Sequence, residues 1–411
     1  VNVYTDTKGI TTDGNGLFEF SVNKQEFITF SHIGYEKIVI SAEEIGRIVY
    51  LSPISLHSKK IYVRSGLREV SWLDSPSSIS ILGKSNIDNE PLNHFQGLTQ
   101  LIPNLNWAGG TSRPRYFQIR GIGERSLYTG EGPPNFSVGF VIDDIDFTGI
   151  GMPGLLFDMN QIEVLRGPQS SIFGSNAMAG LISMRSVEPI SHFESSIQTT
   201  IATENTRNIG ISINTPLLKN LNTRISVFSS ETDGFRENQY KNITNSDGKS
   251  ELLIRNKSTW FPFSFIQLDL TALYSQQNNK YDVWAPDNNK NLITYSDREG
   301  KDSQVSRAFA LRTSVQDVAG FDLLSITTYS LNEMEHSYDG DWGNSELWSQ
   351  DPYNFNSDIQ GWEYDFFDKT IKNHSIVTEE VRIYRDLSNK SSVIVGSYVK
   401  FLSETDDASG Y

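Results

Sequence analysis

Carboxylate and imidazole side chains are the groups through which this sequence could carry out catalysis or hold a metal ion. Asp143, Asp144 and Asp146 follow an apolar run and could act as paired acid and base groups or bind a cation. The sequence places no basic or nucleophilic residue beside them, so a solvated strand end is the favoured interpretation. The six histidines lack the spacing of metal ligands. We therefore expect no catalytic residue, no metal site and no cofactor.

A glycine-rich stretch, Gly149–Gly154, matches the G-x-G-x-x-G pattern of dinucleotide-binding loops. Such a site needs a full helix directly afterwards, because the helix N-terminus must face the pyrophosphate. Only residues 155–160 separate this stretch from the next predicted strand, and they are too few for that helix. The pattern therefore predicts a loop and not a nucleotide site.

Composition narrows the class of protein further. The chain has 411 residues, a net charge of −15 and no cysteine, so a disulfide framework is excluded and a nucleic-acid partner is not expected. Mean hydropathy is −0.37, and no apolar run approaches the length of a membrane helix. Membrane-spanning β-strands escape that test, because every second residue faces away from the lipid. An aromatic content of 11% suits such strands.

The stretch that organises the chain is Gln161–Ser186, which reads QIEVLRGPQSSIFGSNAMAGLISMRS. Residues 162–165 are branched and apolar and predict a short strand, which the following Gly-Pro pair ends. Residues 169–173 predict a single helical turn, and the next three residues tolerate positive φ. Residues 181–184 predict a second strand.

This string resembles the signature of the plug domain of TonB-dependent outer-membrane receptors, which reads roughly IEVLRGPQS-x-x-[YF]G-x-x-A-x-x-G-x-I. FQIRGIG at 117–123 and GFVIDD at 139–144 resemble further strands of that domain. The resemblance implies an α/β plug over residues 76–187. It assigns the plug motif to Arg120, Gly121, Asp143, Glu163, Arg166, Gly167, Pro168, Gly174, Ala177 and Gly180.

The residues before the plug divide into two parts. Residues 1–56 read as short alternating strands and resemble the carboxypeptidase-regulatory-like β-sandwich that precedes the plug in many of these receptors, here truncated at its N-terminus. Residues 57–75 predict a linker. Within it, Ile61, Tyr62, Val63, Arg64 and Ser65 alternate and resemble the TonB box, which binds its partner by strand addition. An ordinary linker strand is the alternative, since two lysines precede the segment.

Residues 188–411 predict the N-terminal part of a transmembrane β-barrel. Nine alternating segments are expected as strands: 195–203, 207–215, 222–231, 249–261, 264–276, 303–315, 321–335, 374–386 and 391–404. After the first turn, their connections alternate between short and long, as in outer-membrane barrels. The fold class is thus mainly β: a sandwich, an α/β plug and the first nine or so antiparallel strands of a barrel of about 22 strands. We expect the chain to be a fragment.

The resemblance implies a non-enzymatic importer in the outer membrane of a Gram-negative bacterium. Its partners would be the energy-transducing TonB protein, outer-membrane lipid and a siderophore-like ligand. The Arg-Gly-Pro-Gln-Ser string at 166–170 favours an iron–siderophore cargo over the oligosaccharide cargo of SusC-like importers. A secreted or periplasmic β-sandwich enzyme or binding module is the alternative from another class, and it predicts even loop lengths.

Two further hypotheses concern individual side chains. In this family, arginines of the plug strings pair with glutamates of the inner barrel wall, so Arg120 or Arg166 is expected to pair with Glu380 in the TEEVRIY segment. Plug-apex residues Arg125, Tyr128 and Phe147 are weaker candidates for ligand binding.

Overall fold

The computed structural model describes residues 1–53, 61–63, 69–90, 92–108, 110–124, 136–170, 176–388 and 391–410. The described residues form two compact units, and the boundary between them in the sequence lies near residue 75. Most regular structure in both units is β-strand, as the sequence predicts. Of the helices in the described residues, none is long and apolar enough to cross a membrane.

The first unit contains a four-stranded antiparallel sheet in the order β2-β1-β3-β4. Its strands are β1 (Asn2–Tyr4), β2 (Gly9–Thr11), β3 (Phe27–Ser31) and β4 (Ile38–Ser41). Val3, Ile28 and Phe30 form its core. A hairpin of β5 (Tyr62–Val63) and β6 (Val70–Ser71) follows, with the 3-10 turn η1 (Trp72–Asp74). The described residues of this unit form a four-stranded sheet and a two-stranded hairpin, so the two-layer sandwich stays a prediction.

The plug segment of the second unit is built on a mixed five-stranded sheet in the order β11-β10-β13-β12-β7. The strands are β7 (Ile79–Gly83), β10 (Val138–Ile142), β11 (Ile145–Asp146), β12 (Met159–Arg166) and β13 (Gly180–Ser186). The continuous apolar runs of β10 and β12 are buried, which is why they do not alternate in sequence. Around the sheet lie α1 (Lys84–Asp88), α2 (Phe95–Leu98), η2 (Thr99–Leu101), β8 (Leu105–Trp107) and β9 (Phe117–Ile119).

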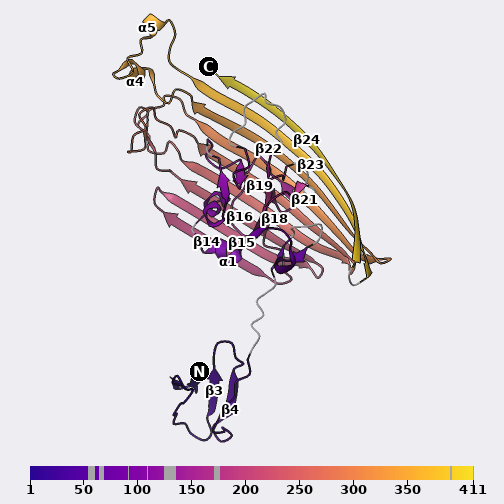
Figure 1. Ribbon diagram of the computed structural model, residues 1–411. Helices are drawn as coiled ribbons and strands as arrows, with labels where there is room; N and C mark the ends of the chain where they lie inside the picture. The colour runs from indigo at the N-terminus through magenta and orange to yellow at the C-terminus, as the bar shows by residue number, and fades with distance from the viewer. Residues whose placement is uncertain are drawn as a thin grey trace. The chain divides into compact units, whose positions relative to one another are not determined.

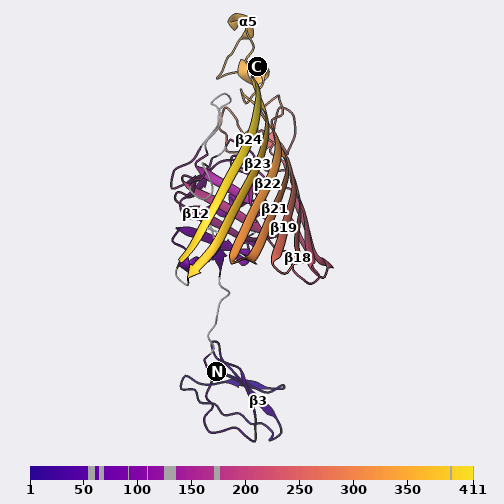
Figure 2. The ribbon, with the colours of Figure 1, turned by 90° about the vertical axis from the view of Figure 1, so that its right-hand side faces the viewer.

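A nine-stranded antiparallel sheet, called the wall below, curves beside the plug (Figures 1 and 2). All nine predicted strands are confirmed. They are β14 (Glu194–Ala202), β15 (Thr206–Leu218), β16 (Leu221–Thr232), β18 (Lys249–Phe263), β19 (Ile266–Lys280), β21 (Lys301–Val318), β22 (Phe321–Asp339), β23 (Phe367–Ser388) and β24 (Ser391–Gly410).

The wall is asymmetric from one end to the other. At one end its strands are joined by the tight turns 219–220, 264–265 and 319–320, and at the other by the long loops 233–248, 281–300 and 340–366. The long loops contain β17 (Glu237–Asn238), β20 (Ile293–Thr294), α4 (Ser345–Ser349) and α5 (Ser357–Gln360). Uneven loop lengths are what an outer-membrane barrel shows and a sandwich does not require.

The alternation within each wall strand separates two chemically different faces. On β19, Thr271 and Ser275 are buried toward the plug, whereas Ala272 between them is exposed. On β15, Asn208 and Ser212 are buried while Ile209 and Ile211 are exposed. Polar side chains therefore face the plug, and apolar side chains face outward, where lipid can cover them.

This face assignment predicts the effect of charges on β19. Ala272→Arg places a cation on the outward face near the middle of β19, and it should destabilise folding into a bilayer by about 2–4 kcal/mol, because lipid cannot solvate it. Gln267→Arg is the matched control, since Gln267 points the other way and is only partly covered. Equilibrium urea titrations of the protein in lipid vesicles give both values, and equal losses would refute the assignment.

Candidate functional site

Two adjacent aspartates sit at the tip of a plug hairpin. Ile142 of β10 pairs with Ile145 of β11, which leaves Asp143 and Asp144 as a two-residue turn. Both have positive φ, 48° and 71°, the geometry of a type I′ hairpin turn, which aspartate tolerates better than most residues. This local geometry presents two carboxylates at one point of the plug surface.

Basic side chains of the wall meet both carboxylates. Arg312 of β21 holds Asp144 with two hydrogen bonds of 2.9 and 3.0 Å. Lys257 of β18 lies 3.4 Å from Asp143, and Arg255 lies 3.6 Å from it. Burial disfavours ionisation of Asp143, but these two cations hold its pKa below the usual value, helped by hydrogen bonds from Ser186.

Two more plug acids repeat the arrangement. Asp146 accepts a hydrogen bond of 2.7 Å from Lys400 of β24. Asp158 forms a bidentate pair with Arg224 of β16 at 2.7 and 2.8 Å, and both side chains are only 4% exposed. The prediction of a solvated strand end for Asp143, Asp144 and Asp146 is therefore wrong. Their partners are more than 100 residues further along the chain, where no local pattern could place them.

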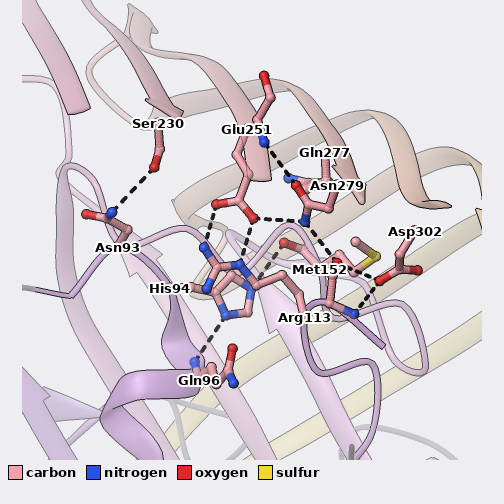
Figure 3. A network of polar contacts seen from close by, with 12 residues as sticks. Asn93, His94, Gln96, Arg113, Met152, Ser230, Glu251, Gln277, Asn279 and Asp302 are labelled. Carbon is pink, nitrogen blue, oxygen red and sulfur yellow. Dashed lines mark hydrogen bonds and ion pairs between the residues drawn. The ribbon is translucent and has the colours of Figure 1, made fainter. Parts of the chain in front are cut away.

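At the other end of the plug the signs of the charges are reversed. Arg113 donates two hydrogen bonds, of 2.6 and 2.7 Å, to Glu251 of β18, and Arg115 lies 2.5 Å from Asp302 of β21. Ser112 adds hydrogen bonds to Asp302 from its backbone N–H and its hydroxyl, both 2.6 Å. Figure 3 shows Arg113 and Glu251 facing each other, with Asp302 nearby. The sequence interpretation missed both arginines.

The plug thus contacts the wall through two belts of opposite sign. Glu251 and Asp302 lie within three residues of the strand ends that carry the long loops. Arg312, Arg224 and Lys257 lie toward the tight turns. We call the first set the loop-side belt and the second, with Arg255 and Lys400, the turn-side belt.

An apolar contact lies in the same interface. The ring of Phe157 in the plug stacks on Phe228 of β16, with ring centroids 5.4 Å apart. Gly210 of β15 lets this ring approach, because a Cβ there would come within 2.3 Å of it. Wall residues Leu253 and Leu273 belong to the same buried cluster as the plug core. The plug is therefore held by apolar packing as well as by charge.

Other residues of the predicted plug motif stabilise the plug itself. Glu163 of β12 is buried and pairs with Arg185 of β13 at 2.6 Å. Gly180 opens β13 with a φ of 157°, and a Cβ there would lie 2.2 Å from the carbonyl oxygen of Leu165. Ala177 is buried, and Gly167 and Pro168 follow the end of β12. Gly174 lies outside the described residues.

The predicted pairing of Glu380 with a plug arginine is not formed. Glu380 pairs instead with Arg382 at 2.5 Å, because residues two apart on β23 share a face. Arg120, with a positive φ of 55°, ends β9 at an exposed position followed by Gly121. Arg166 is partly exposed, and its buried Nε has no hydrogen-bond partner. Ion pairs do hold the plug against the wall, but they do not involve Glu380, Arg120 or Arg166.

The candidate ligand-binding and TonB-box residues have mixed outcomes. Phe147 is fully buried in the plug core, so the prediction that it binds ligand is wrong, and Arg125 and Tyr128 lie outside the described residues. Of the TonB-box candidates, Arg64 and Ser65 also lie outside them. Tyr62 and Val63 form β5, which pairs with β6, and Ile61 accepts a hydrogen bond of 2.8 Å from the N–H of Trp72. The described residues contain no cluster of three metal-binding side chains.

A buried histidine, His94, forms hydrogen bonds within the plug next to the loop-side belt. The Nε2 atom of His94 lies 3.1 Å from the carbonyl oxygen of Met152, and its Nδ1 accepts the N–H of Gln96 (Figure 3). This pattern requires a neutral ring that donates through Nε2. Burial, and next the charge of Arg113, lower the pKa of His94 to about 3.

The His94 pKa predicts how plug stability changes with pH. An unfolded histidine takes up a proton near pH 6.5, whereas the folded plug resists it until about pH 3. Stability is therefore complete above pH 6.5 and is lost as pH falls toward 3, by about 3 kcal/mol between pH 7 and pH 4. Hydrogen exchange of the plug should show this slope in the wild type and in the exposed control His192→Gln, and a smaller one in His94→Gln. An unchanged slope in His94→Gln would contradict the assignment.

The Arg224–Asp158 pair makes a second prediction. Asp158→Asn leaves the buried guanidinium of Arg224 with only the half-exposed Glu194, at 3.3 Å, as a counter-ion, which should destabilise plug seating toward the lower end of about 3–5 kcal/mol. Asp88→Asn is the control, since Asp88 pairs with Lys84 on helix α1 of the plug where both side chains are 49% exposed, and it should change stability by less than about 1 kcal/mol. Chemical denaturation of the receptor with a fluorophore on the plug compares the two. Similar small effects would mean that the pair does not seat the plug.

Comparisons with known proteins agree with this geometry. Residues 72–181 match the family model of the TonB-dependent Receptor Plug Domain. The ferrioxamine B receptor of Salmonella typhimurium is 20% identical over 271 residues, which cover 62% of this chain and 35% of that protein.

Solved structures show the same fold at low sequence identity. The ferric yersiniabactin uptake receptor FyuA of Yersinia pestis is 14% identical, with a TM-score of 0.67 over 82% of this chain and 50% of that one. The ferripyoverdine receptor of Pseudomonas aeruginosa is 12% identical, with a TM-score of 0.66 over 84% and 45%. The chain thus spans about half of these structures and about a third of the curated relative. Residues 72–181 thus belong to the plug family of TonB-dependent receptors, and the second unit shares its fold with the solved receptors.

Proposed function

We propose that the receptor containing this chain imports a scarce ligand, an iron–siderophore complex, across the outer membrane with energy from TonB. The observation that carries the proposal is the plug seated against the wall by two belts of ion pairs. A wall that curves around a separately folded plug can be closed by the plug at rest and opened when the plug moves. The named relatives are transport receptors, not enzymes, which supports the same role.

The chemistry of the interface suits a plug that must move. Several of the contacts are hydrogen-bonded charges, and water can hydrate both partners once they separate. An interface made of apolar packing alone would expose its whole area to water at the same step. Charge pairing thus keeps the closed state specific while limiting the free energy needed to open it.

The force for opening would come through the first unit. The Ile61–Ser65 segment is the proposed attachment point, because an extended strand can join a partner's sheet edge. Its residues Tyr62 and Val63 already pair with β6, so the partner's strand would have to replace β6 in this pairing. Pulling on this segment would act on the plug, which follows directly in the chain.

A disulfide tether tests whether the plug must leave the wall. Asn279 of β19 donates a hydrogen bond of 2.9 Å to the hydroxyl of Ser112 in the plug, and the chain has no cysteine of its own. In the complete receptor, Ser112→Cys with Asn279→Cys should reduce uptake of ⁵⁵Fe-labelled siderophore complexes more than tenfold under oxidising conditions. Ligand binding should stay within about twofold, and reductant should restore uptake.

Each single cysteine variant serves as the control for the loss of the Ser112–Asn279 contact. Uptake in the oxidised double variant at the level of the single variants, with the disulfide verified by mass spectrometry, would show that transport does not need plug movement there. Loss of binding in the double variant would instead point to a damaged binding site.

A further inference from the structure

The three long loops differ from the rest of the chain in charge. Together they carry 13 Asp and Glu residues against 4 Lys and Arg residues, a net charge of −9 out of −15 for the whole chain. The loop 340–366 alone has six acids and no base. Two of the four bases, Lys241 and Arg298, already pair with the loop acids Glu299 and Asp365. The three loops themselves are therefore negative, whereas Lys249, Lys280, Lys301 and Lys369 at the adjoining strand ends bring positive charge to the cavity that they line.

An exposed pair of tryptophans lies within these loops. The rings of Trp284 and Trp342 are 6.0 Å apart between centroids and tilted by 30°, so they form one broad aromatic surface. Their exposed fractions are 49% and 39%. Most other aromatic rings of the loop 340–366 pack on one another instead, as Trp348 does with Tyr353 and Tyr364.

The backbone that presents the pair is held firmly. The carboxylate of Asp339, at the end of β22, accepts the N–H of Trp342 at 3.0 Å, and Trp342 has a positive φ of 62°. The same carboxylate accepts the N–H groups of Asp297 and Arg298 from the neighbouring loop, at 3.1 and 3.3 Å. The side chain of Asp339 thus joins both loops. The left-handed conformation of Trp342 is unusual for a bulky residue, and such strained positions cluster at functional sites.

A chain of contacts places this pair on the plug side of the wall. Asp302 of the loop-side belt contacts plug residue Arg115 and also His336, whose Nδ1 lies 3.1 Å from it. The ring of His336 lies 4.7 Å from that of Tyr281, which is buried at the start of the loop that carries Trp284. The tryptophan pair therefore lies above the plug contacts and not on the lipid side.

We propose that Trp284 and Trp342 dock a positively charged group of the ligand, so that the receptor takes iron complexes that carry an ammonium or similar cation. A cation over an indole face is stabilised by the ring quadrupole, and the surrounding negative field concentrates cations at the loops. The same field repels anionic iron complexes. The identity of the cargo as an iron complex rests on the proposed function, whereas the preference for positive charge rests on the loops alone.

The test uses probes that differ only in charge. Ferrioxamine B is a linear ferric trihydroxamate with one free terminal amine, and acetylation of that amine removes the charge and leaves the iron site unchanged. A ferric tricatecholate provides the anionic comparison. Binding of each to the complete receptor, followed by tryptophan fluorescence at two salt concentrations, should be at least tenfold tighter for the ammonium form than for the acetylated form. That preference should shrink at high salt.

Variants localise the effect. Trp284→Leu and Trp342→Leu should each reduce the preference for the ammonium form by threefold or more, whereas Trp260→Leu, at a tight-turn end of the wall, should not change it. Asp358→Asn with Glu363→Gln lowers the loop charge without touching the tryptophans, and it should weaken binding of the cationic probe two- to fivefold.

Three results would overturn the inference: equal binding of the two trihydroxamates, tighter binding of the tricatecholate, or no binding of the ammonium form. Uptake of ⁵⁵Fe from any of the complexes by cells that carry the receptor reports separately on the proposed function. Uptake without a charge preference would therefore support the proposed import of iron complexes and refute the cation site.

Discussion

The structure depends on pairing charges across an interface that is largely closed to water. A carboxylate or guanidinium buried alone is strongly unfavourable, so a plug charge that is buried against the wall needs a counter-ion on the wall. Asp158 with Arg224 and Arg113 with Glu251 satisfy this requirement with bidentate geometry. Because such geometry tolerates little displacement, these pairs fix where the plug sits, and the apolar contact at Phe157 then fills the space between them.

The wall contacts lipid on one face and the plug on the other, and the sequence of its strands suits both environments. Outward residues must suit lipid, while residues facing the plug must supply hydrogen bonds, and strand alternation allows both in one segment. The residues at the strand ends add a third environment. There the acidic loops, tied together through Asp339, face the aqueous exterior. One continuous sheet therefore meets lipid, plug and water in separate zones.

Sequence reasoning could predict most of the fold because the governing signals are local. Period-two alternation located every strand of the wall, and the turn chemistry of Gly167-Pro168 ended β12 as expected. The site was harder, since Asp143 meets Lys257 only through tertiary folding and no pattern in one sequence encodes that distance. Glu380 illustrates the same limit. Alternation placed it correctly on the inner face, but the sequence did not show that Arg382 would be the nearest cation. Arg113 and Arg115 could have been noticed as unexplained bases in an otherwise polar loop.

The opposite signs of the two belts bear on how the molecule is assembled. A plug that entered the wall upside down would place Asp158 and Asp144 beside Glu251 and Asp302, and Arg113 and Arg115 beside Arg224 and Arg312. Like charges would then face each other at both ends in a medium that screens them poorly. A uniform belt of one sign would not discriminate between the two orientations. The charge reversal thus disfavours the inverted orientation, in addition to the apolar contact at Phe157, which also fits only one orientation.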